Sequence, residues 1–130
     1  TEDPAPILRD ALVDVPGVHG AFVFGSAARG ELGPESDVDL LVLEDPSVPR
    51  TTLHRNLTEV GLILGREVNT VRYTPQALGE RLGEPQSPAW GFVREVLQGP
   101  KRWVAGDDSV MAPLAAAAGV RIGEANSGAE

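Results

Sequence analysis

Residues 22–43 read FVFGSAARGELGPESDVDLLVL, two apolar runs on either side of a polar segment that is rich in glycine. The first run, which begins one alanine earlier, is continuously apolar up to Gly25, as expected of a strand buried on both faces. The second run, residues 37–43, indicates a further strand whose side chains alternate between the two faces. Asp37 and Asp39 therefore leave the same face of this strand. The stretch predicts a central sheet with two acidic side chains at the start of one strand.

Hydrophobic periodicity and capping residues predict the elements around this stretch. We expect helices from Pro4 to about residue 15, from residues 47–49 to 64, after Thr74, over 90–97 and from 107–109 to 118, with strands over 67–73 and 101–105. The fold class is accordingly α/β (α+β), with one mixed sheet of three to five strands flanked by helices. Residues 1–118 are expected to form one domain, and residues 119–130 a polar tail without fixed structure.

The composition of the 130 residues limits the possible functions. With no cysteine, the chain has neither disulfides nor thiolate metal sites. The formal net charge of −8 disfavours general nucleic-acid binding, which needs a basic face, so we do not expect nucleic acid as a partner of this domain. No apolar run approaches the roughly 18 residues that cross a bilayer. We therefore expect a cytoplasmic protein without membrane association.

Asp37 and Asp39 form the pair from which the chemistry is inferred. Two residues apart on a strand, their Cα atoms lie roughly 6.6 Å from each other. Two carboxylates side by side are unfavourable unless a cation or a proton lies between them. Such hard oxygen ligands suit Mg²⁺ or Mn²⁺ when a substrate phosphate completes the coordination shell. The alternative is an exposed acidic face, but the apolar neighbours indicate a core strand, in which unpaired carboxylates are costly.

Gly25 and Ser26 lie where the first strand leads into a short helical turn. A helix N-terminus exposes backbone N–H groups, glycine permits close approach of a phosphate, and the serine hydroxyl adds a donor. By itself the Gly-Ser pair is also compatible with an ordinary turn. Ten residues separate Ser26 from Asp37, and the combination of turn, spacing and acidic strand points to a nucleotide site. Arg29 is placed either to reach the phosphates or to lie on the surface.

The stretch over residues 22–43 resembles the active-site motif of the minimal nucleotidyltransferases, within the DNA polymerase β-like superfamily. The resemblance continues more loosely through residues 65–78, GREVNTVRYTPQAL, to residues 101–107, KRWVAGD. It implies the nucleotidyltransferase fold, similar to the polymerase β palm, and transfer of a nucleoside monophosphate, here AMP, from ATP to a hydroxyl acceptor. Acceptors in this family include a protein tyrosine, such as that of a HEPN-type toxin, and small molecules such as an aminoglycoside.

The resemblance also implies roles for single residues. Asp37 and Asp39 would bind Mg²⁺ (or Mn²⁺) as catalytic residues and bridge it to the triphosphate. Gly25 and Ser26 would hold the β- and γ-phosphates, with Arg29 as a further candidate for nucleotide binding.

The third carboxylate of the family is expected on the strand over residues 67–73. In the best register that position is Asn69, whose amide carries no charge and is not a useful base at neutral pH. Glu67, two residues earlier, is the other candidate for the third ligand, or else the ion-pair partner of an arginine. Asn69 leaves an alternative function open: a catalytically weak nucleotide-binding module, acting as a regulator or as an antitoxin that contacts its toxin.

Histidine and aromatic residues are weaker candidates. His19 and His54 are far apart in the sequence and do not indicate a ligand pair. Trp90, Phe92 and Trp103 are expected to fill the core beneath the last helices, and base stacking by one of them is the less favoured interpretation.

Overall fold

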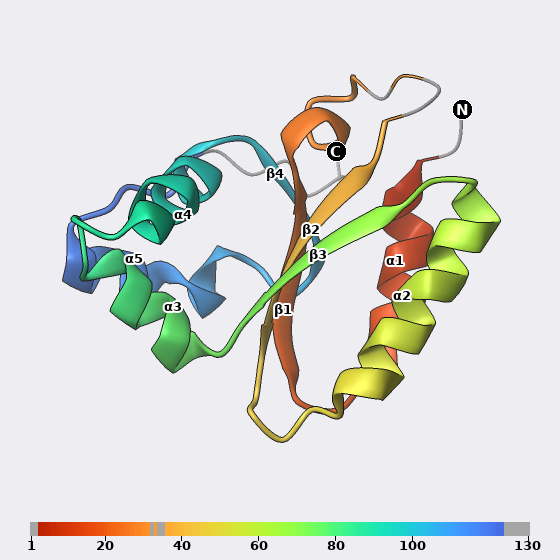
Figure 1. Cartoon of the computed structure of the whole chain (residues 1–130), viewed down its shortest axis with the longest axis horizontal. Coiled ribbons are helices and arrows are strands. Elements are labelled where there is room, and N and C mark those ends of the chain that lie inside the picture. The colour runs from red at the N-terminus through yellow and green to blue at the C-terminus, as the bar shows by residue number, and fades with distance from the viewer. Residues whose placement is uncertain (1–2, 32, 34–35, 124–130) are drawn as a thin grey trace.

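The computed structural model describes residues 3–31, 33 and 36–123, and Figure 1 shows the arrangement of these residues. Four strands form a sheet in the spatial order β3-β2-β1-β4. The strands are β1 (Val18–Phe24), β2 (Val38–Glu44), β3 (Val68–Tyr73) and β4 (Lys101–Ala105). β1 runs antiparallel to both of its neighbours, whereas β2 and β3 are parallel. The sheet is therefore mixed, as predicted.

Helices cover both faces of the sheet (Figure 1). α1 (Pro4–Val13) and α2 (Arg50–Leu64) lie on one face, and α3 (Pro75–Leu82), α4 (Pro88–Gln98) and α5 (Ala112–Ala118) lie on the other. Two short 3₁₀ segments, η1 (Gly25–Ala27) and η2 (Asp108–Val110), follow β1 and β4. The predicted α/β (α+β) class is confirmed.

Side-chain caps followed by proline begin three of these helices. Asp3, Thr74 and Ser87 each accept a hydrogen bond from a backbone N–H of the first turn, and each precedes a proline whose missing N–H costs nothing there. The helix starts at Pro4 and after Thr74 were predicted from the sequence. The Ser87 cap was not recognised in the sequence. The predicted start of α4 at Trp90 therefore lies two residues after the observed start at Pro88.

Two apolar clusters on opposite faces of the sheet form the core. Val38, Leu40 and Val42 belong to the cluster that packs under α1 and α2. Leu41 and Leu43 belong to the cluster under α3, α4 and α5. The predicted alternation of β2 is thus confirmed, and by the same alternation Asp39 faces the side of α3 to α5.

Several boundaries and one core prediction differ from the sequence analysis. β1 begins at Val18 rather than at residue 21, because its first residues still pair with the end of β2. The last helix begins only at Ala112, after the separate η2 turn. Trp103 is buried, as predicted, but Phe92 is 44% exposed, so the prediction that it fills the core was wrong.

The division of the chain at residue 118 stays a prediction. Val120 and Ile122, just beyond that boundary, nevertheless pack against the cluster under α3 to α5. Residues 124–130 of the predicted tail lie outside the described residues. Among the helices of the described residues, none has both the length and the apolar character needed to cross a membrane.

Candidate functional site

Gly25 and Asp39 meet at one end of the sheet because β1 and β2 are antiparallel neighbours. Phe24, the last residue of β1, lies opposite Asp39 in the strand register. Gly25 follows with a φ of +70°, and a Cβ atom on it would lie 2.8 Å from Oδ2 of Asp39. A positive φ already favours glycine, and here a side chain would also collide with the carboxylate. Glycine at this position lets the start of η1 sit directly against Asp39.

Asn69 joins the two aspartates from the neighbouring parallel strand. It lies opposite Asp39 in the register of β2 and β3. Its side-chain nitrogen Nδ2 donates a 3.1 Å hydrogen bond to Oδ2 of Asp37. The structure therefore brings together the two aspartates and the amide that occupies the expected place of the third carboxylate. The amide oxygen of Asn69 takes no part in this bond and is a possible metal ligand.

Arg66 braces the loop that leads to Asp37. Its Nη1 donates to the carbonyl oxygens of Gly33 (2.6 Å) and Ser36 (2.7 Å). The backbone N–H of Arg66 in turn donates to Gly61 of α2, so the brace is anchored on a helix. The sequence analysis missed this residue. The available signal was an arginine directly after Gly65, the left-handed residue that ends α2.

A cavity of about 410 Å³ borders Asp39 on the side toward β1 and α4. Its wall contains Gly25 and Arg29 beside Asp39, and the α4 residues Phe92 and Glu95. The remaining lining residues are Phe24, Val96, Gly99 and Pro100. Arg29 also donates through Nε to Glu31 (3.0 Å), an exposed ion pair of the kind that contributes little to stability.

Glu67 is not brought to the aspartates in the same way. It directly precedes β3, is exposed, and its backbone oxygen accepts from the N–H of Val38. It lines a hollow between α2 and β3, on the other face of the sheet from Asp39. Within the described residues, no side-chain hydrogen bond or ion pair of Glu67 is found, so the predicted pairing with an arginine is not seen there.

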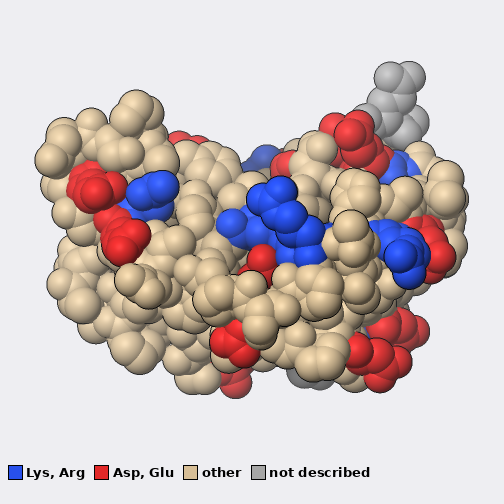
Figure 2. All heavy atoms as spheres, turned by 60° about the horizontal axis from the view of Figure 1, so that its bottom comes forward, with Lys and Arg blue, Asp and Glu red and all other residues tan. Residues whose placement is uncertain are grey.

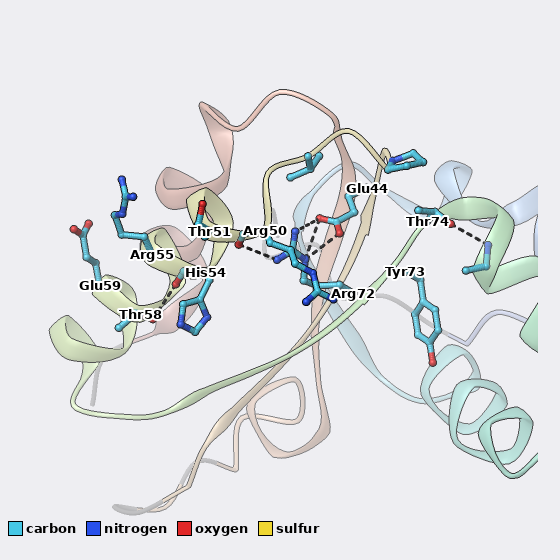
Figure 3. A pocket seen from close by; sticks show the side chains of 13 residues that line it. Glu44, Arg50, Thr51, His54, Arg55, Thr58, Glu59, Arg72, Tyr73 and Thr74 are labelled. Carbon is cyan, nitrogen blue, oxygen red and sulfur yellow. Dashed lines mark hydrogen bonds and ion pairs between the residues drawn. The ribbon is translucent and has the colours of Figure 1, made fainter.

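A hollow of about 1000 Å³ lies at the opposite end of β2 and β3 (Figure 3). Figure 2, in which the bottom of Figure 1 is turned toward the viewer, shows a group of basic side chains in the middle of the surface. The hollow is lined by Arg50, Arg55 and Arg72. Arg72 forms a two-pronged ion pair with Glu44 and also donates to the carbonyl of Arg50. This arrangement ties β3 to β2 and to the start of α2. None of the residues predicted for the site lines this hollow.

Asp37, Asp39 and Asn69 offer two carboxylates and one amide. Within the described residues, no group of three or more acidic, histidine or cysteine side chains is close enough to hold a metal ion. Mg²⁺ commonly takes only one or two protein carboxylates and completes its octahedral shell with water and substrate phosphates. The arrangement therefore suits a metal that arrives with, and is shared with, a phosphate ligand.

A comparison with protein families agrees with this geometry. The family model described as "Nucleotidyltransferase domain" matches residues 6–99, a span that includes the Gly25 turn, both aspartates and Asn69. This chain belongs to the nucleotidyltransferase domain family. The resemblance inferred from residues 22–43 is thereby confirmed.

Solved structures show that the nucleotidyltransferase fold extends over nearly the whole chain. A toxin-antitoxin structure with AMP-PNP has a TM-score of 0.63 at 16% identity, over 88% of this chain and 82% of that chain. A structure from Shewanella oneidensis has a TM-score of 0.58 at 11% identity, over 91% and 82% of the two chains. A tri-AMPylated Shewanella oneidensis HEPN toxin in complex with its MNT antitoxin gives 0.52 at 15% identity, over 87% and 75%. Among curated proteins, no significant match was found.

Proposed function

We propose that this nucleotidyltransferase domain transfers AMP from ATP to a hydroxyl group of an acceptor, with Mg²⁺ held by Asp37 and Asp39. The observation that carries the proposal is the contact between Gly25 and Asp39, which joins a turn suited to phosphates to an acidic pair suited to Mg²⁺. The family membership supports the reaction class.

The side chains fit a divalent ion on the chemistry of their donors. Asp37 and Asp39 supply two carboxylates, and the amide oxygen of Asn69 would be a neutral third ligand. Bound there, Mg²⁺ or Mn²⁺ would supply neutralisation of the negative charge on the phosphates. The brace from Arg66 to the loop before Asp37 keeps the first carboxylate in position without requiring the metal.

The other residues of the site bind and orient the substrate. Gly25 and Ser26 at the start of η1 would donate backbone N–H groups and a hydroxyl to the β- and γ-phosphates, and Arg29 would add its guanidinium. The acceptor hydroxyl gives its proton to solvent and its oxygen bonds to the α-phosphorus, while the bond between the α-phosphorus and the α,β-bridging oxygen breaks and pyrophosphate leaves. Most of the rate enhancement in such a site comes from alignment and charge neutralisation.

For the acceptor, we propose a tyrosine of a HEPN-type partner protein. The support is one of the solved structures of similar fold, which holds an AMPylated HEPN toxin with its MNT antitoxin. The experiment incubates the chain with α-labelled ATP, Mg²⁺ and the HEPN-type protein of its own genome, and counts label on the partner. Asp39→Asn should lower transfer by roughly 100-fold or more. Asp10→Asn, an exposed aspartate of α1, is the matched control and should leave transfer unchanged.

Absence of label on the partner with the parent chain would reject this acceptor, and equal labelling by the Asp39→Asn variant would reject catalysis at the aspartate pair. A second function is favoured by one observation, the hydrogen bond from Asn69 to Asp37, which places an amide where a base is expected. In that case the chain is a nucleotide-binding antitoxin or regulator. Calorimetry would then show Mg²⁺-dependent ATP binding in the absence of any turnover.

A further inference from the structure

A row of aromatic rings leads from the core to the cavity beside Asp39. Trp103 packs edge-on against Phe22 with ring centroids 5.0 Å apart, and Phe22 packs against Phe24 at 6.3 Å. Phe24 then packs edge-on against Phe92 of α4 at 6.1 Å and 73°. Trp103 and Phe22 are buried, so the ring contacts that start from them support the exposed ring of Phe92. Phe92 is thus held in place although it is 44% exposed.

Phe92 stands out among the exposed apolar side chains. The other large ones in the described residues are the aliphatic Val13, Leu62 and Ile63. Packing in the core does not explain why an aromatic ring stands at this exposed position. A flat ligand bound there would cover the ring. A T-shaped contact with Phe24 engages at most one of the two faces of Phe92, and with 44% of the residue exposed a flat ligand can stack on the ring.

The cavity next to this ring continues the proposed phosphate site. Its wall contains Gly25, Arg29 and Asp39 together with Phe92 and Glu95 of α4. Its volume of about 410 Å³ falls within the roughly 300–1000 Å³ usual for small-molecule sites. A nucleotide whose phosphates lie against Gly25 therefore has space for its nucleoside between β1 and α4.

We propose that this cavity is the nucleoside subsite, in which the base stacks on Phe92 and the ribose hydroxyls donate to the carboxylate of Glu95. The inference rests on the proposed function, since it assumes that the phosphates bind at Gly25 and Asp39. Phe92 and Glu95 are three residues apart on α4 and so lie on the same side of the helix.

The chemistry of the wall explains this division of roles. Stacking on a phenyl ring tolerates every base, because each base has a π-face. Of the charged side chains in the wall, Asp39 is assigned to the metal and Arg29 to phosphate, which leaves Glu95 for the nucleoside. An ionised carboxylate only accepts hydrogen bonds, and its two oxygens match the two adjacent hydroxyls of ribose. The subsite is therefore selective for a ribonucleotide and permissive for the base.

Binding calorimetry on the full chain tests the proposal with three probes in the presence of Mg²⁺: ATP, 2′,3′-dideoxy-ATP and inorganic tripolyphosphate. Phe92→Ala should weaken ATP roughly 5- to 100-fold, as expected for loss of one stacked base, and leave tripolyphosphate within about twofold. Phe92→Trp should retain or improve ATP binding. Ile63→Ala, an exposed apolar side chain on α2, is the control and should change neither probe.

Glu95 is tested by the preference of the protein for the ribose hydroxyls. The parent should bind ATP roughly tenfold more tightly than dideoxy-ATP, as expected for hydrogen bonds to a charged acceptor. Glu95→Ala should reduce this ratio to about one, whereas Glu59→Ala on α2 should preserve it. Alanine is well tolerated at an exposed helical position, so folding is retained.

The outcomes distinguish an error in the nucleoside subsite from an error in the proposed phosphate site. If Phe92→Ala binds ATP as tightly as the parent, or weakens tripolyphosphate equally, the stacking assignment is overturned. An unchanged ratio of ATP to dideoxy-ATP affinity in Glu95→Ala overturns the ribose assignment. If the parent binds neither ATP nor tripolyphosphate, the phosphate site itself is wrong and the proposed function fails first.

Discussion

Replacing Asn69 by aspartate would place a third carboxylate beside Asp37 and Asp39. In the parent chain the Asn69 amide donates to Oδ2 of Asp37 at 3.1 Å, and Asn69 lies opposite Asp39 in the strand register. The substitution keeps the size of the side chain but removes the donor and adds a negative charge. Without a cation the variant should be less stable, and with Mg²⁺ it should be stabilised more strongly than the parent.

The magnitude follows from two contributions. A hydrogen bond to a charged group contributes about 1.5–3 kcal/mol when well protected, and this exposed one is taken at about 1 kcal/mol. Two like charges about 4 Å apart in a water-like dielectric cost about 1 kcal/mol. The loss of about 2 kcal/mol corresponds to a fall in Tm of roughly 7 °C for a domain of this size.

Thermal unfolding in EDTA and in about 10 mM Mg²⁺ measures both effects. A ligand at 100 times its Kd stabilises the folded state by about 2.7 kcal/mol, so Mg²⁺ should recover or exceed the deficit of Asn69→Asp. Asn56→Asp is the matched control, because Asn56 also donates an amide hydrogen bond, to Ala11 O, but far from the aspartates. It should lose stability equally in both buffers. A variant of Asn69 whose Tm is unchanged in EDTA, or whose response to Mg²⁺ equals that of the parent, would falsify the assigned geometry.

Three further predictions concern stability and the fit of single residues. Gly25→Ala should lower the free energy of unfolding in urea by about 1–3 kcal/mol, because φ is +70° and the new Cβ would press on Asp39. The same variant should bind Mg²⁺–ATP more weakly in calorimetry. Unchanged stability and affinity would contradict this prediction. Arg72→Met should cost about 2–3 kcal/mol, because it leaves the Glu44 carboxylate, 13% exposed, without its cation; the double variant with Glu44→Met should recover part of the loss. Burial lowers the pKa of Lys101 from 10.5, with a smaller opposing effect of a nearby aspartate. Between the lowered value and 10.5 the unfolded chain binds more protons, so the unfolding free energy of the parent relative to Lys101→Met should rise as the pH approaches 10.5; a flat difference in urea titrations at several pH values refutes this.

The contact between the turn at Gly25 and the acidic strand could be predicted from the sequence because the turn ends one strand and the aspartates begin the next. A buried strand that ends at Gly25 and a second strand that begins near Asp37 imply that the two ends meet if the strands pair. The face to which each side chain of β2 points was also predicted, because successive side chains of a strand point to opposite faces of the sheet. The place of Asn69 followed from the family register, and the pairing of Asn69 with Asp39 agrees with it. The catalytic and binding roles of these residues stay predictions.

What the sequence did not reveal depends on contacts between distant elements. The brace formed by Arg66 joins the end of α2 to a loop about thirty residues earlier, and no local pattern marks it. Phe92 was assigned to the core because an apolar residue between helical neighbours usually faces inward. It lies instead on the side of α4 that lines the cavity beside Gly25. Helical spacing indicates which residues share a face but not what lies opposite that face.

The presence of an amide at Asn69 also bears on the acceptor. A carboxylate at that place would take the proton of an attacking hydroxyl, whereas the amide does not act as a base at neutral pH. A hydroxyl that ionises more readily then has the advantage: a phenol has a pKa of about 10, well below the pKa of water or of an aliphatic hydroxyl. We therefore expect transfer to a tyrosine-bearing protein to exceed transfer to an aminoglycoside sugar. Asn69→Asp should narrow this difference by raising the rate with the weaker acid. Rates measured with labelled ATP on both acceptor types decide the point, and an equal preference in the parent and in Asn69→Asp would show that the proton leaves by a route in which residue 69 takes no part.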